Sequence, residues 1–314
     1  MNNALPIQAG FVFAGVFAVL LLATLIGNHL KNKHILNPNP VINNMNARIS
    51  SWWVMMMVLL FAFWFDHIGA TLLFFFISLA ALREFMTLIY QRRGDHNAIA
   101  ACFYVLLPLQ YYFVLTNWYG MFAVLIPVYA FLILPIISGL SGDTVALFER
   151  SAKIQWGAMM SIFCLSHVPA IMTLNIPEFA GRNILLLIFM IVVVQSSDVL
   201  QYIFGKLWGK TPIAPALSPN KTVVGTVGGM ASATILAACL YQITPFTPFQ
   251  AALIGFVMCV MGFLGGLVMS GIKRSYGVKD WGKMIHGHGG MLDRVDSICF
   301  AAPVFFHIVR YFWA

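Results

Sequence analysis

A hydrophilic segment near the C-terminus, residues 270–296, interrupts a chain that is otherwise almost entirely apolar. Glycines and two histidines accompany its charged residues, which are Lys273, Arg274, Lys279, Lys283, Arg294, Asp280, Asp293 and Asp296. Carboxylates are preferred ligands of hard cations such as Mg²⁺, and lysine and arginine neutralise phosphate oxygens. The segment therefore indicates a site for a metal ion and a phosphorylated substrate, as phosphoryl or nucleotidyl transfer requires.

Each part of this segment also has a simpler explanation. Asp293 and Asp296 share one face if the last apolar span is helical, and acidic side chains favour helix N-termini without any ligand. The glycines of residues 287–290 free the backbone to surround an anion, but a bare turn explains them equally well. His286 and His288 lack the further ligands of a zinc site. The joint pattern, rather than any single residue, points to catalysis.

A second polar segment, residues 195–229, contains a carboxylate inside an apolar stretch. A charge at membrane depth is costly unless it is paired, solvated or bound to a cation, so Asp198 either belongs to the site or makes a polar contact between helices. Ser218 and Pro219 suit a helix start, which would place Lys221 in the first turn. A helix N-terminus disfavours a cation, so a bound anion would offset that cost, although a solvated lysine is as simple an interpretation.

The composition is that of a polytopic integral membrane protein, because 61% of the residues are hydrophobic and 9% are charged, against about 25% charged in soluble domains. We expect an all-α fold of about nine to ten transmembrane helices. The candidate spans are residues 5–27, 52–65, 68–82, 99–116, 118–138, 154–174, 183–204, 222–242, 249–271 and 297–313. They form a single membrane domain, 1–314, with an N-terminal multispan region, 1–180, and a catalytic region, 195–313. Gly225 and Gly229, four residues apart, predict a close helix contact.

The basic residues predict the orientation of the chain. All of the 18 lysines and arginines except Arg182 and Arg310 fall in alternate loops of this map. The positive-inside rule places those loops, 205–221 and 273–296 among them, in the cytoplasm and both termini outside. We expect a bacterial-type inner or cell membrane, an active site facing the cytoplasm and no nucleic-acid partner. The five cysteines form no CxxC pair, so no zinc site or disulfide framework is indicated.

Residues 270–296 resemble the signature of the CDP-diacylglycerol synthase (phosphatidate cytidylyltransferase) family, S-x-x-K-R-x4-K-D-x-[GSA]-x2-[LIF]-[PG]-x-H-G-G-x-x-D-R-x-D. The matching residues are Ser270, Lys273, Arg274, Lys279, Asp280, Gly282, Ile285, His288, Gly289, Gly290, Asp293, Arg294 and Asp296. Two upstream family elements are matched by Asp198, Tyr202, Gly205, Gly209, Lys210, Ala214, Pro215, Ser218, Pro219, Lys221 and Thr222. Close similarity covers residues 195–313, and the N-terminal half adds a family-like Arg83-Glu84-Phe85.

The resemblance implies that CTP and phosphatidate react to give CDP-diacylglycerol and pyrophosphate. We expect Asp198, Asp280 and Asp293 to bind Mg²⁺, with a second cation left open. The catalytic residues would be Asp280, Lys279, Asp293 and Arg294. The substrate-binding residues would be Ser218, Lys221, Thr222, Lys273, Arg274, His288, Gly289, Gly290 and Asp296. The resemblance also implies membrane lipids and a second copy of the chain, in a homodimer, as partners.

Some positions depart from the family pattern, Val223 after the Lys-Thr pair among them, and two of these bear on the site. His286 stands where the signature has Pro or Gly, and Gly266 stands where many members have Asp. These departures indicate a divergent paralogue, so a cytidylyltransferase acting on another lipid phosphate stays open. An anion transporter and a non-catalytic scaffold of the same fold are further alternatives. A transporter would place ionisable residues along a path through the membrane, whereas here Asp198 is the main deep candidate.

Overall fold

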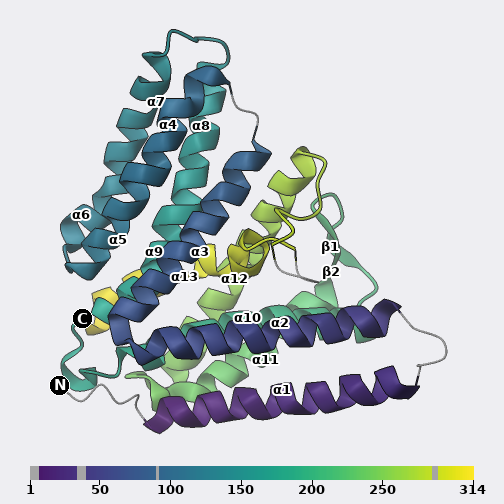
Figure 1. Cartoon of the computed structure of the whole chain (residues 1–314). Helices are drawn as coiled ribbons and strands as arrows, with labels where there is room; N and C mark the ends of the chain where they lie inside the picture. Colours follow the sequence, from purple (N-terminus) through teal and green to yellow (C-terminus); the bar gives the residue numbers. More distant parts are fainter. Residues whose placement is uncertain (1–6, 34–39, 90–91, 285–288) are drawn as a thin grey trace.

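The computed structural model describes residues 7–33, 40–89, 92–284 and 289–314 (Figure 1). In this part of the chain, ten helical stretches are long and apolar enough to cross a membrane. The prediction of an all-α polytopic membrane protein with about nine to ten spans is therefore confirmed. A two-stranded antiparallel hairpin is the one addition to the predicted class among these residues.

The helices differ in length and regularity along the chain. The N-terminal region contains α1 (Ile7–Lys33), α2 (Pro40–Trp64), α3 (Asp66–Leu88), α4 (His96–Ala101), α5 (Leu107–Leu115), α6 (Tyr119–Val124), α7 (Phe131–Gly139), α8 (Leu147–Ala158) and α9 (Leu165–Ala170). The C-terminal region contains α10 (Asn183–Trp208), β1 (Pro212–Ala214), β2 (Ser218–Thr222), α11 (Val223–Cys239), α12 (Pro248–Ser275) and α13 (Leu292–Trp313). The 3-10 segments are η1 (Arg93–Asp95), η5 (Ile171–Thr173), η6 (Pro177–Phe179) and η7 (Leu240–Ile243).

Three π-helical segments join pairs of short helices into full spans. They are η2 (Cys102–Leu106), η3 (Leu125–Ala130) and η4 (Met159–Cys164). Pro108, Pro127 and Pro169 lie within or shortly after these segments. Proline removes one N–H and its ring collides with the carbonyl one turn earlier, so a locally widened turn lets each span continue.

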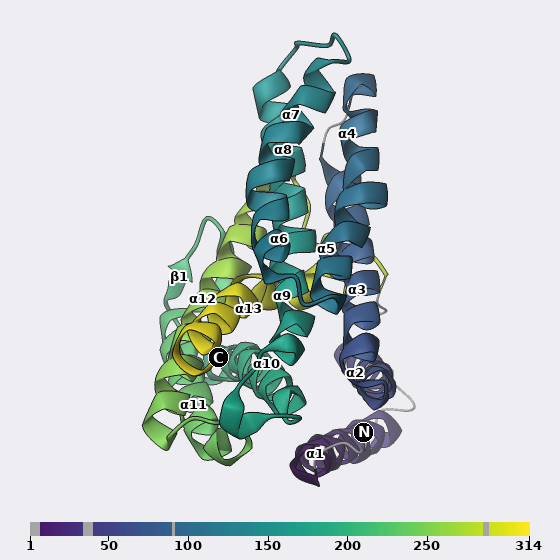
Figure 2. The ribbon, with the colours of Figure 1, turned by 90° about the vertical axis from the view of Figure 1, so that its left-hand side faces the viewer.

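Helices α2 and α3 meet at a sharp bend. Phe65 alone separates them, and Asp66 has a φ of 54°. A Cβ at Gly69 would collide with the carbonyl of Ala62, so glycine is required where the two helices turn past each other. Figures 1 and 2 show the result, in which the axes of α1, α2 and α10 lie roughly parallel and α3, α4, α7 and α8 cross them steeply.

The start of α11 corrects one prediction. Ser218 does not begin a helix, because residues 218–222 pair with β1 as strand β2. The helix begins at Val223 and its N-cap is Thr222, whose hydroxyl accepts the Gly225 N–H at 3.1 Å. Lys221 therefore lies in extended backbone before the helix, and the expected dipole penalty does not apply to it. The local Ser-Pro signal is overridden by pairing across the hairpin.

Helices α10 and α11 pack closely, as the glycine spacing predicts. A Cβ at Gly225 would lie 2.7 Å from the carbonyl oxygen of Gln201, and a Cβ at Gly229 would lie 2.6 Å from the Cα of Gln201. The missing side chains thus let the two backbones approach each other. This contact fixes the hairpin and the start of α11 against the end of α10.

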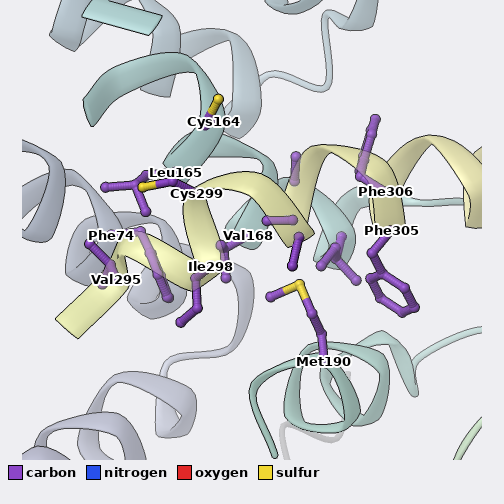
Figure 3. Packing of buried hydrophobic residues seen from close by; sticks show 14 of the residues in the cluster. Phe74, Cys164, Leu165, Val168, Met190, Val295, Ile298, Cys299, Phe305 and Phe306 are labelled. Atoms are coloured by element: carbon purple, nitrogen blue, oxygen red, sulfur yellow. The ribbon is translucent and has the colours of Figure 1, made fainter. Parts of the chain in front are cut away.

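A continuous core of buried side chains joins the two regions through α13. Figure 3 shows Met190 of α10, Leu165 and Val168 of α9 and Phe305 of α13 converging in this core. All four side chains are fully buried. Because lipid is as apolar as these side chains, close packing rather than transfer from water holds α13 in place. The helix that carries Asp293 and Asp296 is therefore anchored along most of its length.

Candidate active site

The two polar segments meet where α10 passes the start of α13. The Ser297 hydroxyl of α13 donates a hydrogen bond of 2.7 Å to Asp198 Oδ2 of α10. Gln195, one turn earlier on α10, donates from Nε2 to the carbonyl oxygen of Arg294 at 3.4 Å. Asp198 thus makes a polar contact between helices and at the same time lies beside the charged segment that the sequence singled out.

Ser297 stands between two carboxylates. Asp296 Oδ1 accepts the backbone N–H of Ser297 at 2.8 Å and lies 3.5 Å from its hydroxyl. Asp198 and Asp296 also interact electrostatically with each other. Two like charges held close together in a membrane protein are stabilised by a cation beside them. Among the described residues, Asp296 forms no hydrogen bond or ion pair with Arg294.

Lys221 reaches this carboxylate pair from the hairpin. Its Nζ lies 4.8 Å from the centre of the Phe263 ring of α12. A Cβ at Gly266 would lie 2.9 Å from Lys221 Nζ and 3.9 Å from Ser297 Oγ, so Gly266 leaves the space that Lys221 uses. Lys221 and Arg294 both interact electrostatically with Asp198. The α10 segment, the hairpin, α12 and α13 therefore build one polar centre.

Asp293 holds the connection between α12 and α13. Its Oδ1 accepts Lys273 Nζ at 2.6 Å, and its Oδ2 accepts the backbone N–H groups of Trp281 at 2.8 Å and Gly290 at 3.0 Å. Lys273 and Asp293 are 8% and 9% exposed. A buried ion pair with this many hydrogen bonds organises the loop, and it leaves little capacity on Asp293 for a metal ion.

The rest of the charged segment lies at the rim. Asp280, Lys279 and Arg274 are exposed, and the Asp280 carboxylate makes no hydrogen bond or ion pair with any described residue. Gly289 has a φ of 83°, and a Cβ there would lie 3.3 Å from Asp280 Cβ. Glycine is therefore required where the loop folds back over Asp280. Residues 285–288, which include His288, an expected substrate-binding residue, lie outside the described residues.

A functional residue that the sequence did not single out comes from α3. The Glu84 carboxylate accepts the backbone N–H of Met291 on Oε1 and that of Leu292 on Oε2, both at 2.8 Å. Phe85 stacks on Trp281 with ring centres 5.2 Å apart. Only the family-like Arg83-Glu84-Phe85 triplet hinted at this contact, because the partners lie more than 200 residues along the chain.

Two cations at the centre have no acidic partner within bonding distance. Among the described residues, neither Lys221 nor Arg294 forms an ion pair. Arg294 Nε is buried and lacks a hydrogen-bond acceptor there. Both side chains are partly exposed, but a cation at membrane depth without an ion-pair partner is still costly, and an anion bound at the centre would lower that cost. Thr222, by contrast, already uses its hydroxyl as the α11 cap.

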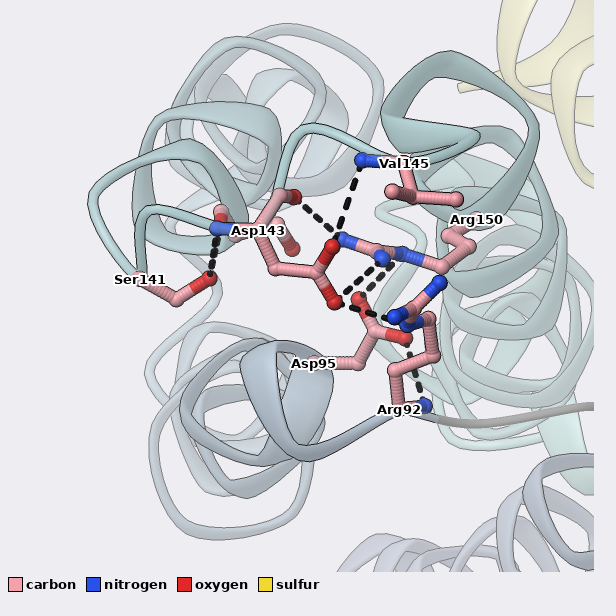
Figure 4. Close-up of polar contacts among 7 residues, drawn as sticks. Arg92, Asp95, Ser141, Asp143, Val145 and Arg150 are labelled. Atoms are coloured by element: carbon pink, nitrogen blue, oxygen red, sulfur yellow. Dashed lines mark hydrogen bonds and ion pairs between the residues drawn. The ribbon is translucent and has the colours of Figure 1, made fainter.

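A second charged cluster joins the start of η1 to the α7–α8 connection, as Figure 4 shows. Arg150 Nε lies 3.1 Å from Asp95 Oδ1, and Arg150 Nη1 lies 2.9 Å from Asp143 Oδ2. Arg92 Nε lies 2.8 Å from the same Asp143 oxygen. Arg150 is almost fully buried, yet both guanidinium groups have carboxylate partners. The cluster therefore ties two connections together and offers no free charge to a ligand.

The chain belongs to the cytidylyltransferase family, whose sequence profile matches residues 46–312. With the fold described above, this family membership makes the protein an integral membrane nucleotidyltransferase.

Relatives of two kinds resemble this chain. The uncharacterized protein YnbB of Escherichia coli (strain K12) is 38% identical over 306 residues, which are 95% of this chain and 97% of YnbB. The phosphatidate cytidylyltransferase of Staphylococcus saprophyticus is 38% identical over 160 residues, and that of Staphylococcus aureus (strain COL) is 34% identical over 157 residues. Each of these two matches covers 49% of this chain and 60% of the relative's length.

Proposed function

We propose that this protein transfers the cytidylyl group of CTP to phosphatidate, forming CDP-diacylglycerol and pyrophosphate. The observation that carries the proposal is the pair of carboxylates, Asp198 and Asp296, beside the unpaired cations Lys221 and Arg294. Acids and bases gathered around one polar centre suit a polyphosphate with its counter-ion. The relatives named phosphatidate cytidylyltransferase support the choice of substrates.

In this reaction an oxygen of the lipid phosphate attacks the α-phosphorus of CTP. A new P–O bond forms as the bond from the α-phosphorus to the bridging oxygen breaks, and pyrophosphate leaves with that electron pair. The phosphate monoester is already anionic, so no separate general base is required. Lys221 and Arg294 would neutralise phosphate oxygens in the ground state and the leaving group in the transition state. Lys279 and Arg274 at the rim would guide the anionic nucleotide inward.

The residues present fit a magnesium ion that is shared with the substrate. Among the described residues, no group of three His, Cys, Asp or Glu gathers as a complete protein site. Mg²⁺ at nucleotide sites typically takes one or two carboxylates, with phosphate oxygens and water completing its shell. We assign these carboxylates to Asp198 and Asp296, and Asp280 at the rim is the candidate ligand of a second cation. Asp296 takes the place of Asp293, whose oxygens already accept hydrogen bonds from Lys273, Trp281 and Gly290. When bound, the ion would neutralise phosphate charge.

We also propose that the polar centre faces the cytoplasm, because the positive-inside rule places the hairpin and the α12–α13 connection there. Figure 1 shows both at the side of the molecule opposite the C-terminus. CTP would then arrive from water, and the lipid would enter sideways between helices. The homodimer is proposed on the family resemblance, and light scattering of the purified protein in detergent tests it.

The test is a transfer assay with purified protein, CTP labelled in its α-phosphate, Mg²⁺ and a panel of lipid phosphates. The panel contains phosphatidate and an isoprenoid phosphate. Labelled CDP-diacylglycerol from phosphatidate is the expected product. Product from the isoprenoid phosphate alone would show that this lipid, and not phosphatidate, is the substrate. That result would fit the divergent paralogue that the Gly266 departure indicates. No labelled lipid from any member would overturn the proposal.

Matched variants link activity to the carboxylate pair. Asp198→Asn and Asp296→Asn should each abolish turnover in protein that is still folded and membrane-inserted. Asp66→Asn is the control, because Asp66 is exposed, distant from the centre and held at a positive φ that asparagine tolerates. Full activity in either centre variant would remove the metal assignment.

A further inference from the structure

We propose that Glu84 of α3 is a positioning residue, which fixes the first turn of α13 and so places Arg294 and Asp296 at the polar centre. The consequences for catalysis rest on the proposed function, whereas the structural role stands on the contacts alone. Glu84 touches neither of the carboxylates nor either unpaired cation. It acts through the backbone of α13, the helix that carries Arg294 and Asp296.

The contact is a helix cap supplied from a distant part of the chain. No side chain of α13 or its own N-cap residue, Met291, caps the start of the helix. Instead the two Glu84 oxygens each accept one of its first N–H groups at 2.8 Å. The first N–H groups of a helix have no partner within the helix, and carboxylates are the strong acceptors for them.

The contact also accounts for an acid near the end of α3. Glu84 lies about one turn before the C-terminal end of α3, close to the partial negative charge of the helix end, which disfavours an acid. The positive end of α13 offsets that cost, because an anion at a helix N-terminus is favoured. Glu84 is also only partly exposed, so water screens the interaction less than at a free surface.

Two glycines of the α12–α13 connection make room for the Glu84 carboxylate. A Cβ at Gly282 would lie 2.7 Å from Glu84 Oε1, and a Cβ at Gly290 would collide with Glu84 Oε2. Any other residue at these positions would push the carboxylate away from the helix start. The loop therefore wraps around Glu84, while the neighbouring Phe85 stacks on Trp281 from the same loop.

The cap lies shortly before the residues of α13 that we propose to bind the substrate and its cation. The backbone N–H groups of Met291 and Leu292 donate the hydrogen bonds to Glu84, and Arg294 and Asp296 follow shortly along the helix. The Arg294 N–H itself bonds to the Met291 carbonyl oxygen at 2.9 Å. If Met291 moves, Arg294 moves with it. Loss of such a supporting contact typically costs about 10- to 100-fold in metal affinity or activity.

The first experiment measures amide hydrogen exchange and needs no activity. Glu84→Gln keeps the side-chain shape but presents an NH₂ group to one of the two N–H donors. We expect peptides that span residues 289–294 to exchange at least about 10-fold faster, with peptides from α9 and α10 unchanged. Glu178→Gln is the control, because Glu178 is exposed and its side chain forms no hydrogen bond or ion pair with the described residues. Wild-type exchange at 289–294 in Glu84→Gln would overturn the proposal.

The second experiment measures the Mg²⁺ dependence of transfer in the same variants. Glu84→Gln should raise the Mg²⁺ concentration for half-maximal rate by about 10-fold or more and lower kcat, with Glu178→Gln like wild type. A role in folding alone predicts less folded protein with unchanged Mg²⁺ dependence, and that result would overturn the proposal. If wild type transfers to no lipid phosphate, the proposed function fails while the exchange experiment still decides the role of Glu84.

A shorter acid keeps the test decisive if Glu84→Gln does not fold. Glu84→Asp keeps the charge beside the helix start but falls one methylene short of both N–H groups. We expect Glu84→Asp to show exchange rates at 289–294 and a Mg²⁺ dependence between those of wild type and Glu84→Gln. If Glu84→Gln does not fold, Glu84→Asp should still exchange faster than wild type at 289–294 and require more Mg²⁺. Wild-type behaviour of Glu84→Asp in both measurements would overturn the requirement for the direct cap.

Discussion

Replacing Asp293 by asparagine distinguishes a loop-organising carboxylate from a metal ligand. Three donors meet its two oxygens, namely Lys273 Nζ at 2.6 Å, the Trp281 N–H at 2.8 Å and the Gly290 N–H at 3.0 Å. Asparagine offers one oxygen and one NH₂, so at least one donor would face another donor. Removing one partner of a buried ion pair costs about 3–5 kcal/mol, and a stranded backbone N–H adds about 1–3 kcal/mol.

The assay is reversible denaturant unfolding of purified protein in detergent, with Asp66→Asn as control. We expect Asp293→Asn to lose at least about 3 kcal/mol of unfolding free energy. Lys273→Met in the same chain removes the stranded ammonium, so the double variant should be less destabilised than the sum of the two single variants. An Asp293→Asn protein that is as stable as wild type and altered only in Mg²⁺ dependence would refute this reasoning and restore Asp293 as a ligand.

Three further outcomes follow from the contacts. Thr222→Ala should cost about 1 kcal/mol of unfolding free energy through the lost α11 cap, measured against Thr87→Ala, whose exposed hydroxyl caps no helix. Gly229→Ala should cost about 1–3 kcal/mol by overpacking α10, whereas Gly10→Ala, with open space around it, should not. Burial raises the pKa of Asp143, but the Val145 N–H and then Arg150 and Arg92 outweigh it and hold that pKa below its usual value. Its stabilisation is therefore complete above the unfolded pKa and is lost as pH falls through the lower folded pKa, so Asp143→Asn should flatten the acid side of a melting-temperature profile.

The membrane fold could be predicted because each span is a local property. A run of apolar residues long enough to cross the bilayer identifies itself without any partner, and all ten spans appear in the described chain. Asp198 could be singled out for a related reason, since a carboxylate inside an apolar run is costly. Its contact with Ser297 shows where that cost is offset.

The parts that could not be predicted depend on partners that are distant in sequence. Ser218 looks like a helix start by itself, but the strand that pairs with it decides its conformation. Asp293 and Asp296 are equivalent by spacing, and only the folded loop shows that one binds Lys273 while the other lies beside Asp198. The family-like Arg83-Glu84-Phe85 triplet marks Glu84 but does not indicate what Glu84 contacts, because the N–H groups that it caps belong to α13.

The contact between Asp198 and Ser297 has a consequence for biosynthesis. Chains enter the membrane from the N-terminus, so α10 and the hairpin are in place before α13 leaves the ribosome. Until then Asp198 lacks its hydroxyl donor and Lys221 has no acidic neighbour on α13. A nascent chain halted after α12 therefore has only Lys221 near the Asp198 carboxylate, and this incompletely satisfied charge is costly within the membrane until α13 inserts.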